Sequence, residues 1–254
     1  ALGRPCLVVV GHEKAGKSTL LDTAIGRGIF PRAKGFCTKM AVRLILERSD
    51  EPELPELRVV DFESADAAPA WIALPSDLDI DCLPDIVRET MDAIAEGERI
   101  VTDREIQIRI RAPDGLQLEL VDIPGLPGRD AAGSRRADAE SLILKVIAVH
   151  KGTASFLWVH DITQQLANSD IGKLLSDAGV VAQTFGVMTK VDTLQPSDPD
   201  ETTIAEIERQ LSAASKLAGG GMQHPWHAVA SRAGDLEARR LWEKEGCKGS
   251  LEAR

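Results

Sequence analysis

The stretch that decides the fold covers residues 6 to 18 and reads CLVVVGHEKAGKS. Residues 6–10 form a short apolar run that ends at Gly11, which is typical of a buried parallel strand. The apolar residues of 20–25 then recur at helical spacing and stop at Gly26. The sequence therefore predicts a strand, a glycine-rich loop and a helix, in that order.

The loop from Gly11 to Ser18 fits the pattern GxxxxGK[ST]. Its glycines allow successive backbone N–H groups to converge on phosphate oxygens, and the helix N-terminus adds partial positive charge. We expect Lys17 to hold the β- and γ-phosphates and the Ser18 hydroxyl to bind Mg²⁺. The other nucleotide-binding positions predicted in this segment are Gly11, Ala15, Gly16 and Thr19. An accidental glycine-rich turn is the alternative, and the strand and helix on either side disfavour it.

A second element for the metal is expected at the end of a neighbouring strand. Residues 116–121 read LQLELV and lead into Asp122-Ile123-Pro124-Gly125. We expect the Asp122 carboxylate to bind Mg²⁺ directly or through water, and the Gly125 N–H to contact the γ-phosphate. Taken alone, such a segment is a common turn. Its position after a strand and beside a phosphate loop favours the metal site.

The base-binding element is predicted at Thr189-Lys190-Val191-Asp192, which follows the apolar run 184–188. A carboxylate at Asp192 can accept hydrogen bonds from N1–H and the 2-amino group of guanine, whereas adenine offers neither donor. The aliphatic stem of Lys190 can lie over the base. The sequence therefore favours GTP over ATP and argues against an ATPase or a kinase. A solvated Lys-x-Asp at a helix start is the alternative for this segment.

The remaining pattern predicts one α/β domain over residues 1–254, with a mainly parallel sheet and helices on both faces. Residues 106–110 and 116–120 alternate with period two around Pro113-Asp114-Gly115, which predicts an antiparallel hairpin. Further strands are expected at 41–46, 155–159, 184–188 and 227–231, and helices at 80–96, 137–150, 170–177 and 200–217. Residues 49–75 give no clear assignment.

Composition limits the classes of partner. The chain has 254 residues, with 40 acidic and 30 basic side chains and a net charge of −10, which argues against nucleic acid and against attraction to anionic lipid. Its four cysteines are dispersed and suggest neither a disulfide framework nor a zinc site. No apolar run approaches the length of a membrane span. Because the chain starts at Ala1, almost directly with a strand, we expect it to be a fragment of a longer protein.

Three further segments add a family resemblance. Phe30-Pro31-Arg32, Gly35-Phe36-Cys37-Thr38 and Leu166-Ala167-Asn168-Ser169-Asp170 resemble dynamin motifs. Together with the three nucleotide motifs, they make the chain similar to the GTPase domain of the dynamin family over about residues 5 to 242. This resemblance implies a P-loop GTPase fold.

The resemblance also implies roles for individual residues. Thr38 would be the switch I threonine that closes over Mg²⁺ and the γ-phosphate. Ser231 and Arg232 would lie in the last base-contacting loop, although dynamins carry asparagine where this chain has Ser231. Asn168 and Asp170 would belong to a loop that pairs two GTPase domains, and helix capping by Asp170 is the equal alternative.

The expected catalytic residues depart from the dynamin pattern. Leu126 follows Gly125, where Ras-type GTPases place a water-orienting glutamine. Dynamins use a loop glutamine and serine instead, and the matching positions are Glu13 and Lys14. Lys14 is a candidate cationic finger that replaces the monovalent cation of dynamins, and Glu13 a candidate acceptor for the attacking water. In the alternative, both side chains point into solvent.

The resemblance implies a Mg²⁺-dependent GTP hydrolase stimulated by pairing of two GTPase domains. It implies a cytoplasmic parent protein with peripheral membrane association, acting in membrane remodelling or fission. Contact with membrane or cytoskeleton would be made only through segments outside this chain. A GTP-binding switch or scaffold with little hydrolysis is the alternative.

Overall fold

The computed structural model describes residues 4–31, 38–62, 68–95, 97, 99–113, 115–129, 134–166, 169–194, 198, 200–217, 222 and 226–229, with the backbone alone for 215–217. Its strands are β1 (Cys6–Gly11), β2 (Ala41–Arg48), β3 (Glu56–Asp61), β4 (Ile72–Ala73), β5 (Arg104–Ala112), β6 (Leu118–Asp122), β7 (Ser155–Asp161), β8 (Thr184–Thr189) and β9 (Trp226–Ala228). Its helices are α1 (Lys17–Ile25), α2 (Leu83–Ile94), α3 (Arg135–His150), α4 (Asp170–Asp177) and α5 (Thr203–Leu217).

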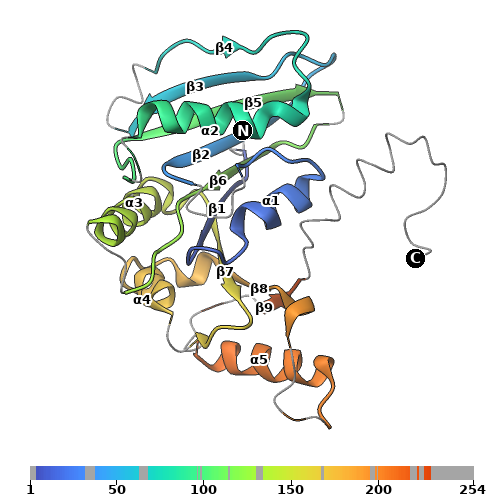
Figure 1. Ribbon diagram of the computed structural model, residues 1–254, viewed down its shortest axis with the longest axis vertical. Coiled ribbons are helices and arrows are strands. Elements are labelled where there is room, and N and C mark those ends of the chain that lie inside the picture. The colour runs from blue at the N-terminus through green and yellow to red at the C-terminus, as the bar shows by residue number, and fades with distance from the viewer. Residues whose placement is uncertain are drawn as a thin grey trace, which may run out of the picture.

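The described strands form a single sheet in the order β4-β3-β5-β2-β6-β1-β7-β8-β9. Figure 1 shows it running from β4 at the top to β9 near the bottom, with α3 and α4 on the left and α1 on the right. Pairing is parallel from β6 through β1, β7 and β8 to β9, and also between β2 and β5. It is antiparallel between β2 and β6, between β3 and β5, and between β3 and β4. The predicted α/β class, with a mainly parallel sheet, is confirmed.

The predicted hairpin between 106–110 and 116–120 needs a correction. Both strands form and run in opposite directions, but β2 lies between them and pairs with each. β2 also passes close to the turn that follows β5. A Cβ on Gly115 would lie 2.5 Å from the carbonyl oxygen of Glu47 in β2, so only glycine fits there. The antiparallel partner of β6 is therefore β2, and not β5 across the turn.

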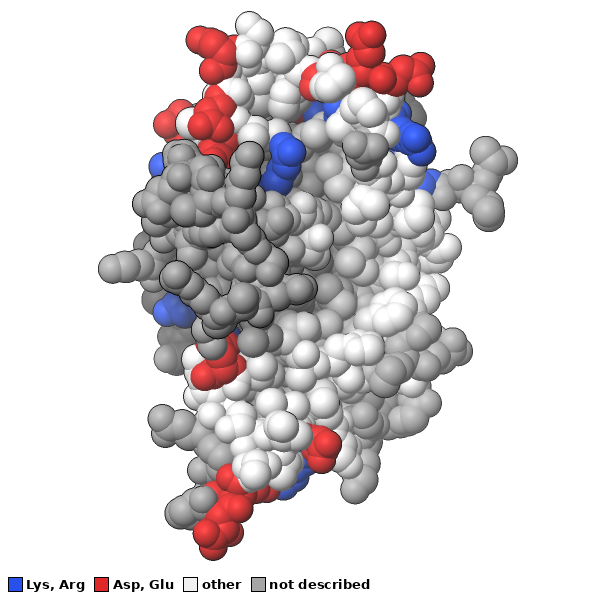
Figure 2. All heavy atoms as spheres, turned by 90° about the vertical axis from the view of Figure 1, so that its right-hand side faces the viewer, with Lys and Arg blue, Asp and Glu red and all other residues white. Residues whose placement is uncertain are grey.

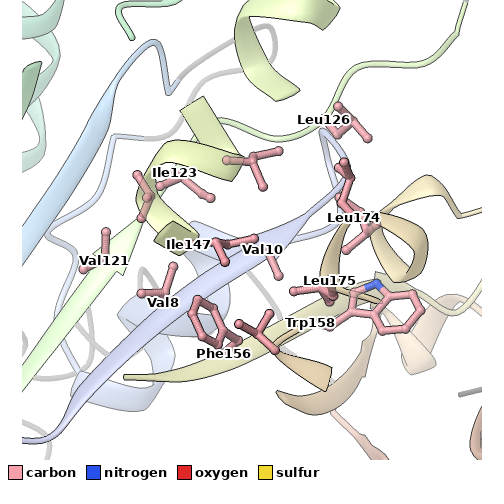
Figure 3. Close-up of a cluster of buried hydrophobic side chains, with 14 of the residues drawn as sticks. Val8, Val10, Val121, Ile123, Leu126, Ile147, Phe156, Trp158, Leu174 and Leu175 are labelled. Atoms are coloured by element: carbon pink, nitrogen blue, oxygen red, sulfur yellow. The ribbon is translucent and has the colours of Figure 1, made fainter. Parts of the chain in front are cut away.

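Two layers of apolar side chains hold the helices on the sheet. Successive residues of a strand point to opposite faces. Accordingly, Val8 and Val10 of β1 pack with α3 and α4, while Val9 packs with α1 and α2. Figure 3 shows the first of these layers, built from β1, β6, β7, α3 and α4. The predicted arrangement of helices on both faces is confirmed.

One edge of the sheet collects the ends of several strands. β1, β6, β7 and β8 are mutually parallel, so their C-terminal ends meet at the same edge. The antiparallel β2 begins there, since its Val42 pairs with Asp122 at the end of β6. Segments that are distant in sequence are thus brought together at this edge.

Acidic side chains gather toward the upper and lower ends of the face shown in Figure 2, and few Lys or Arg side chains are visible among its described residues. Within the described part of the chain, no helix combines the length and the apolar character needed to cross a membrane.

Candidate functional site

The loop between β1 and α1 turns tightly at two residues with positive φ. Gly16 has φ 86°, which suits glycine, and Lys14 has φ 60°, which is uncommon for a residue with a side chain. Gly11 is needed for a different reason, because a Cβ there would lie 2.4 Å from the carbonyl oxygen of Val159 in β7. The loop is therefore packed directly against the neighbouring strand.

Lys17, the first residue of α1, turns back over this loop. Its side chain is only 7% exposed, and Nζ donates to the carbonyl oxygen of His12 at 3.2 Å. Burial lowers the pKa of Lys17, while the nearby carboxylates of Asp122 and Glu13 oppose that shift. The ammonium group is thus held inside the loop, where a phosphate chain would lie.

Ser18 and Asp122 form the polar pair beside Lys17. Ser18 Oγ donates to Asp122 Oδ2 at 2.7 Å, and Asp122 is fully buried. Burial raises the pKa of Asp122 to about 6, although Lys17 and the Ser18 hydroxyl favour its charged form. Its Oδ1 finds no hydrogen-bond partner among the described residues. A buried carboxylate oxygen with a free lone pair, next to a hydroxyl, fits the oxygen ligands that Mg²⁺ prefers.

Gly125 joins the end of β6 to the loop. A Cβ on Gly125 would lie 2.5 Å from the Cα of Glu13, so no larger residue fits. The next residue, Leu126, accepts a hydrogen bond from the Glu13 N–H at 3.1 Å and donates to the Gly11 carbonyl at 3.0 Å. Leu126 itself is fully buried. It is therefore part of the core and cannot take the place of a water-orienting side chain.

The segment at the end of β8 is tied to the same loop. Thr189 is buried and donates its hydroxyl to the carbonyl oxygen of Ala15 at 2.6 Å, and its side chain packs against Gly16. Lys190 has φ 60°, and Asp192 is exposed. Thr189 thus fixes the predicted base-binding element to the predicted phosphate loop.

Asp161, at the end of β7, is a site residue that the sequence argument missed. Its Oδ2 lies 2.6 Å from Lys190 Nζ. Burial disfavours the ionised carboxyl, but hydrogen bonds from Lys190 and Thr163 outweigh burial and lower its pKa. The sequence does hold a signal for this residue. Asp161 directly follows the largely apolar run SFLWVH, just as Asp122 is the last residue of an apolar strand.

The two expected catalytic side chains of the loop have different surroundings. Lys14 is exposed, whereas Glu13 accepts hydrogen bonds from Arg135 of α3. Arg135 was not predicted as a partner of Glu13, because no local sequence pattern marks a contact so far along the chain.

Of the residues assigned by resemblance, Thr38 lies just before β2, at the edge where Asp122 ends β6, and is 9% exposed. Asp170 is the first residue of α4 and binds Arg129 and Arg136, each at 2.6 Å. Hydrogen bonds from these arginines lower its pKa to about 2. Asn168, Ser231 and Arg232 lie outside the described residues.

Comparisons with known proteins agree with this arrangement. A family model described as Dynamin family matches residues 7–191. Dynamin of Drosophila melanogaster is 30% identical over 200 residues, covering 76% of this chain and 21% of the relative. Dynamin-related protein 3A of Arabidopsis thaliana is 29% identical over 208 residues, covering 75% and 23%. Phragmoplastin DRP1A of Arabidopsis thaliana is 24% identical over 262 residues, covering 98% and 39%.

The chain thus spans about a fifth to two fifths of the length of the curated relatives it matches. The family match covers well over half of the chain and contains the loop, Asp122, Gly125 and Thr189. The chain therefore belongs to the dynamin family, whose members are GTP-hydrolysing enzymes.

Proposed function

We propose that this chain binds GTP in a Mg²⁺-dependent manner and hydrolyses it to GDP and phosphate, as one GTPase domain over residues 1–254. The observation that carries the proposal is the group formed by the buried Lys17, the half-buried Ser18 and the buried Asp122, beside a loop that Thr189 fastens to the predicted base-binding element. A triphosphate and a guanine bound at these two places would be held by one rigid edge of the sheet.

Each residue contributes a separate interaction. Lys17 and the N–H groups from Gly16 to Thr19 bind phosphate oxygens, and the Gly125 N–H contacts the γ-phosphate. Ser18, Asp122 and Thr38 would hold Mg²⁺, which when bound supplies positive charge to the β- and γ-phosphate oxygens. Lys190, Asp192, Ser231 and Arg232 would surround the base.

Hydrolysis would depend on Lys14 and Glu13. The exposed Lys14 can fold over the phosphates and offset charge that develops on the transferred group, in place of a monovalent cation. Glu13 is bound by Arg135, so it must be reoriented before it can accept a hydrogen bond from the attacking water. The ion pair between Glu13 and Arg135 therefore favours a second candidate function, that of a GTP-binding switch with little hydrolysis.

For the parent protein, the proposal includes pairing of two GTPase domains, membrane remodelling or fission, and a cytoplasmic location with peripheral membrane association. Family membership supports these proposals, and one relative, from Schizosaccharomyces pombe, is named Vacuolar protein sorting-associated protein 1. Contact with membrane or cytoskeleton would lie in segments beyond this chain.

The test combines binding and turnover by two variants. We expect Lys17→Ala to abolish GTP binding, because Lys17 contacts phosphate in every bound state. Thr38→Ala should bind GTP and lose hydrolysis, since switch I closes only around the γ-phosphate and metal. Thr38→Ser keeps the hydroxyl and should keep hydrolysis. Tight GTP binding by Lys17→Ala, or normal turnover by Thr38→Ala, would contradict the assignment.

A further inference from the structure

Glu13 is held in place by contacts from two other segments. Its N–H donates to the Leu126 carbonyl at 3.1 Å, and its Cα lies against Gly125. Its carboxylate oxygens lie 2.5 and 2.6 Å from Nη2 of Arg135, in the first turn of α3. The side chains of Arg135 and Glu13 are 26% and 21% exposed, so the pair is largely shielded from water.

This carboxylate lies in an electrostatically unfavourable place for a nucleotide loop. Glu13 is itself a residue of the loop and its Cα lies against Gly125, the expected γ-phosphate contact, while Asp122 adds a second carboxylate beside Ser18. A triphosphate bound by the loop would meet both negative charges. In a partly buried site, like charges a few ångströms apart repel each other, because water screens them less than it does at an open surface.

We propose that Arg135 is a positioning residue of the nucleotide site, which neutralises Glu13 and holds it away from the phosphates, so that the loop accepts a triphosphate. The Glu13–Arg135 pair then behaves as a neutral unit in the phosphate loop. The inference rests on the proposed GTP binding. It adds a residue of α3, more than a hundred positions along the chain, to the determinants of that binding.

The prediction that distinguishes this role from a structural one is a dependence on Glu13. If Arg135 acts by neutralising Glu13, it is needed only while position 13 carries a charge. Arg135→Ala should weaken GTP binding roughly 10- to 100-fold, because the carboxylate is left unpaired near the phosphates. In the Glu13→Gln background, the same substitution should change GTP affinity less than about twofold.

The experiment measures equilibrium binding of GTP and GDP, with Mg²⁺ present, to the unchanged chain, the two single variants and the double variant. The loss in Arg135→Ala should be larger for GTP than for GDP, and it should shrink as salt is added. Arg135→Lys keeps the charge and should bind GTP within a few-fold of the unchanged chain. Arg135→Gln repeats the comparison if the alanine variant does not fold.

A matched control uses the ion pair between Arg109 of β5 and Glu56 of β3, at 2.5 Å with side chains 18% and 20% exposed. It lies on strands near the far end of the sheet, beyond β2 and β6 from the loop. Arg109→Ala should change thermal stability without a selective loss of GTP over GDP.

The outcomes separate the two proposals. Absence of GTP binding by the unchanged chain would overturn the proposed function and this inference together. GTP binding with an equal loss from Arg135→Ala in both backgrounds, or with no loss, would overturn the inference alone. An equal loss in both backgrounds would mean that Arg135 acts without Glu13. No loss would mean that Glu13 needs no neutralising partner.

Discussion

At the scale of single residues, we expect guanine selectivity to depend on Asp192, whose exposed side chain follows the buried Thr189 by three positions. Because Thr189 fastens this segment to the loop, the distance from Asp192 to a bound phosphate chain is constrained. We expect this carboxylate to contact the edge of the base, so that its chemistry can be changed without altering the phosphate site.

We expect Asp192→Asn to weaken GTP binding and to shift preference toward xanthosine triphosphate. The N–H₂ of the asparagine amide can donate to the 2-oxo group of xanthine. Toward guanine, the same N–H₂ faces the 2-amino group, so that two donors oppose each other. Each mismatched hydrogen bond is worth about 1 to 3 kcal/mol when buried. Competition binding of GTP, ATP and xanthosine triphosphate measures the shift. Asp50→Asn, another exposed aspartate beyond the opposite end of β2, is the control. Equal affinity of the unchanged chain for ATP and GTP would refute this role.

Lys14 carries the second prediction at this scale. We expect Lys14→Ala to slow GTP hydrolysis about 10- to 1000-fold, at or below the effect of an arginine finger, because an ammonium is a point charge without the arginine fork. Single-turnover hydrolysis with and without added potassium measures it, and Lys173→Ala on the exposed face of α4 is the control. An unchanged rate that depends strictly on potassium or sodium would assign the charge to a bound cation instead.

The sequence predicted those residues of the candidate site whose positions depend on local pattern. Lys17 and Ser18 begin α1 after the loop, Asp122 and Thr189 are the last residues of β6 and β8, and the structure brings these side chains to one edge of the sheet. Their functional roles remain proposals. Asp161 and Arg135 were missed because each acts through a distant partner, Lys190 or Glu13, and local spacing holds no information about such a contact.

At the scale of secondary structure elements, the same limit explains the hairpin. Alternation on either side of a turn identified β5 and β6 and their opposite directions. A period of two residues does not say, however, which strand lies next to which in the sheet. The neighbour is β2, which enters between them from more than fifty residues earlier. β3 was missed because it lies second from the edge of the sheet, where the two-residue β4 covers only part of it, and it carries charged residues, Glu56 and Arg58 among them, that hide the alternation of an apolar face.

The C-terminal end of α3 docks on the sheet through a buried histidine. His150 is 6% exposed, and its Nε2 lies 3.0 Å from Nη2 of Arg43 in β2. Since the arginine can only donate, Nε2 must be the acceptor and therefore unprotonated. Burial, with a smaller effect from Arg43, lowers the pKa of His150 to about 4.

This contact predicts a loss of stability in acid. An unfolded histidine takes up a proton below about pH 6.5 and the folded one only near pH 4, so the unfolded chain binds more protons between these values. The free energy of unfolding should fall by on the order of 2 kcal/mol between pH 7.5 and about pH 5 through His150 alone. Urea unfolding of the unchanged chain and of His150→Gln measures it, and the variant should lack this part of the dependence.

His227→Gln serves as the control, because His227 is an exposed residue of β9. Its substitution should leave the pH dependence unchanged. If His150→Gln lost as much stability in acid as the unchanged chain, proton uptake at other groups would account for the effect.

At the scale of the whole molecule, the site lacks an obvious group for positioning the attacking water among the described residues. Leu126 is buried in the core, and Glu13 is bound by Arg135. Pairing of two domains across their nucleotide sites would supply groups from a second copy or reorient the loop. A chain that hydrolyses GTP by itself and one that needs a second copy differ in how rate depends on concentration.

We therefore expect the rate of GTP hydrolysis per molecule, at saturating GTP and Mg²⁺, to rise with protein concentration and then to level off as dimers predominate. The bimolecular encounter limits the rate at low concentration, whereas affinity for GTP should stay constant. Sedimentation in GDP with aluminium fluoride, a mimic of the transferred phosphoryl group, should show a dimer, and Lys17→Ala should remain a monomer because it cannot bind the nucleotide. A rate per molecule that is low and independent of concentration, together with tight GTP binding, would instead favour the switch, in which Arg135 keeps Glu13 from accepting a hydrogen bond from the attacking water.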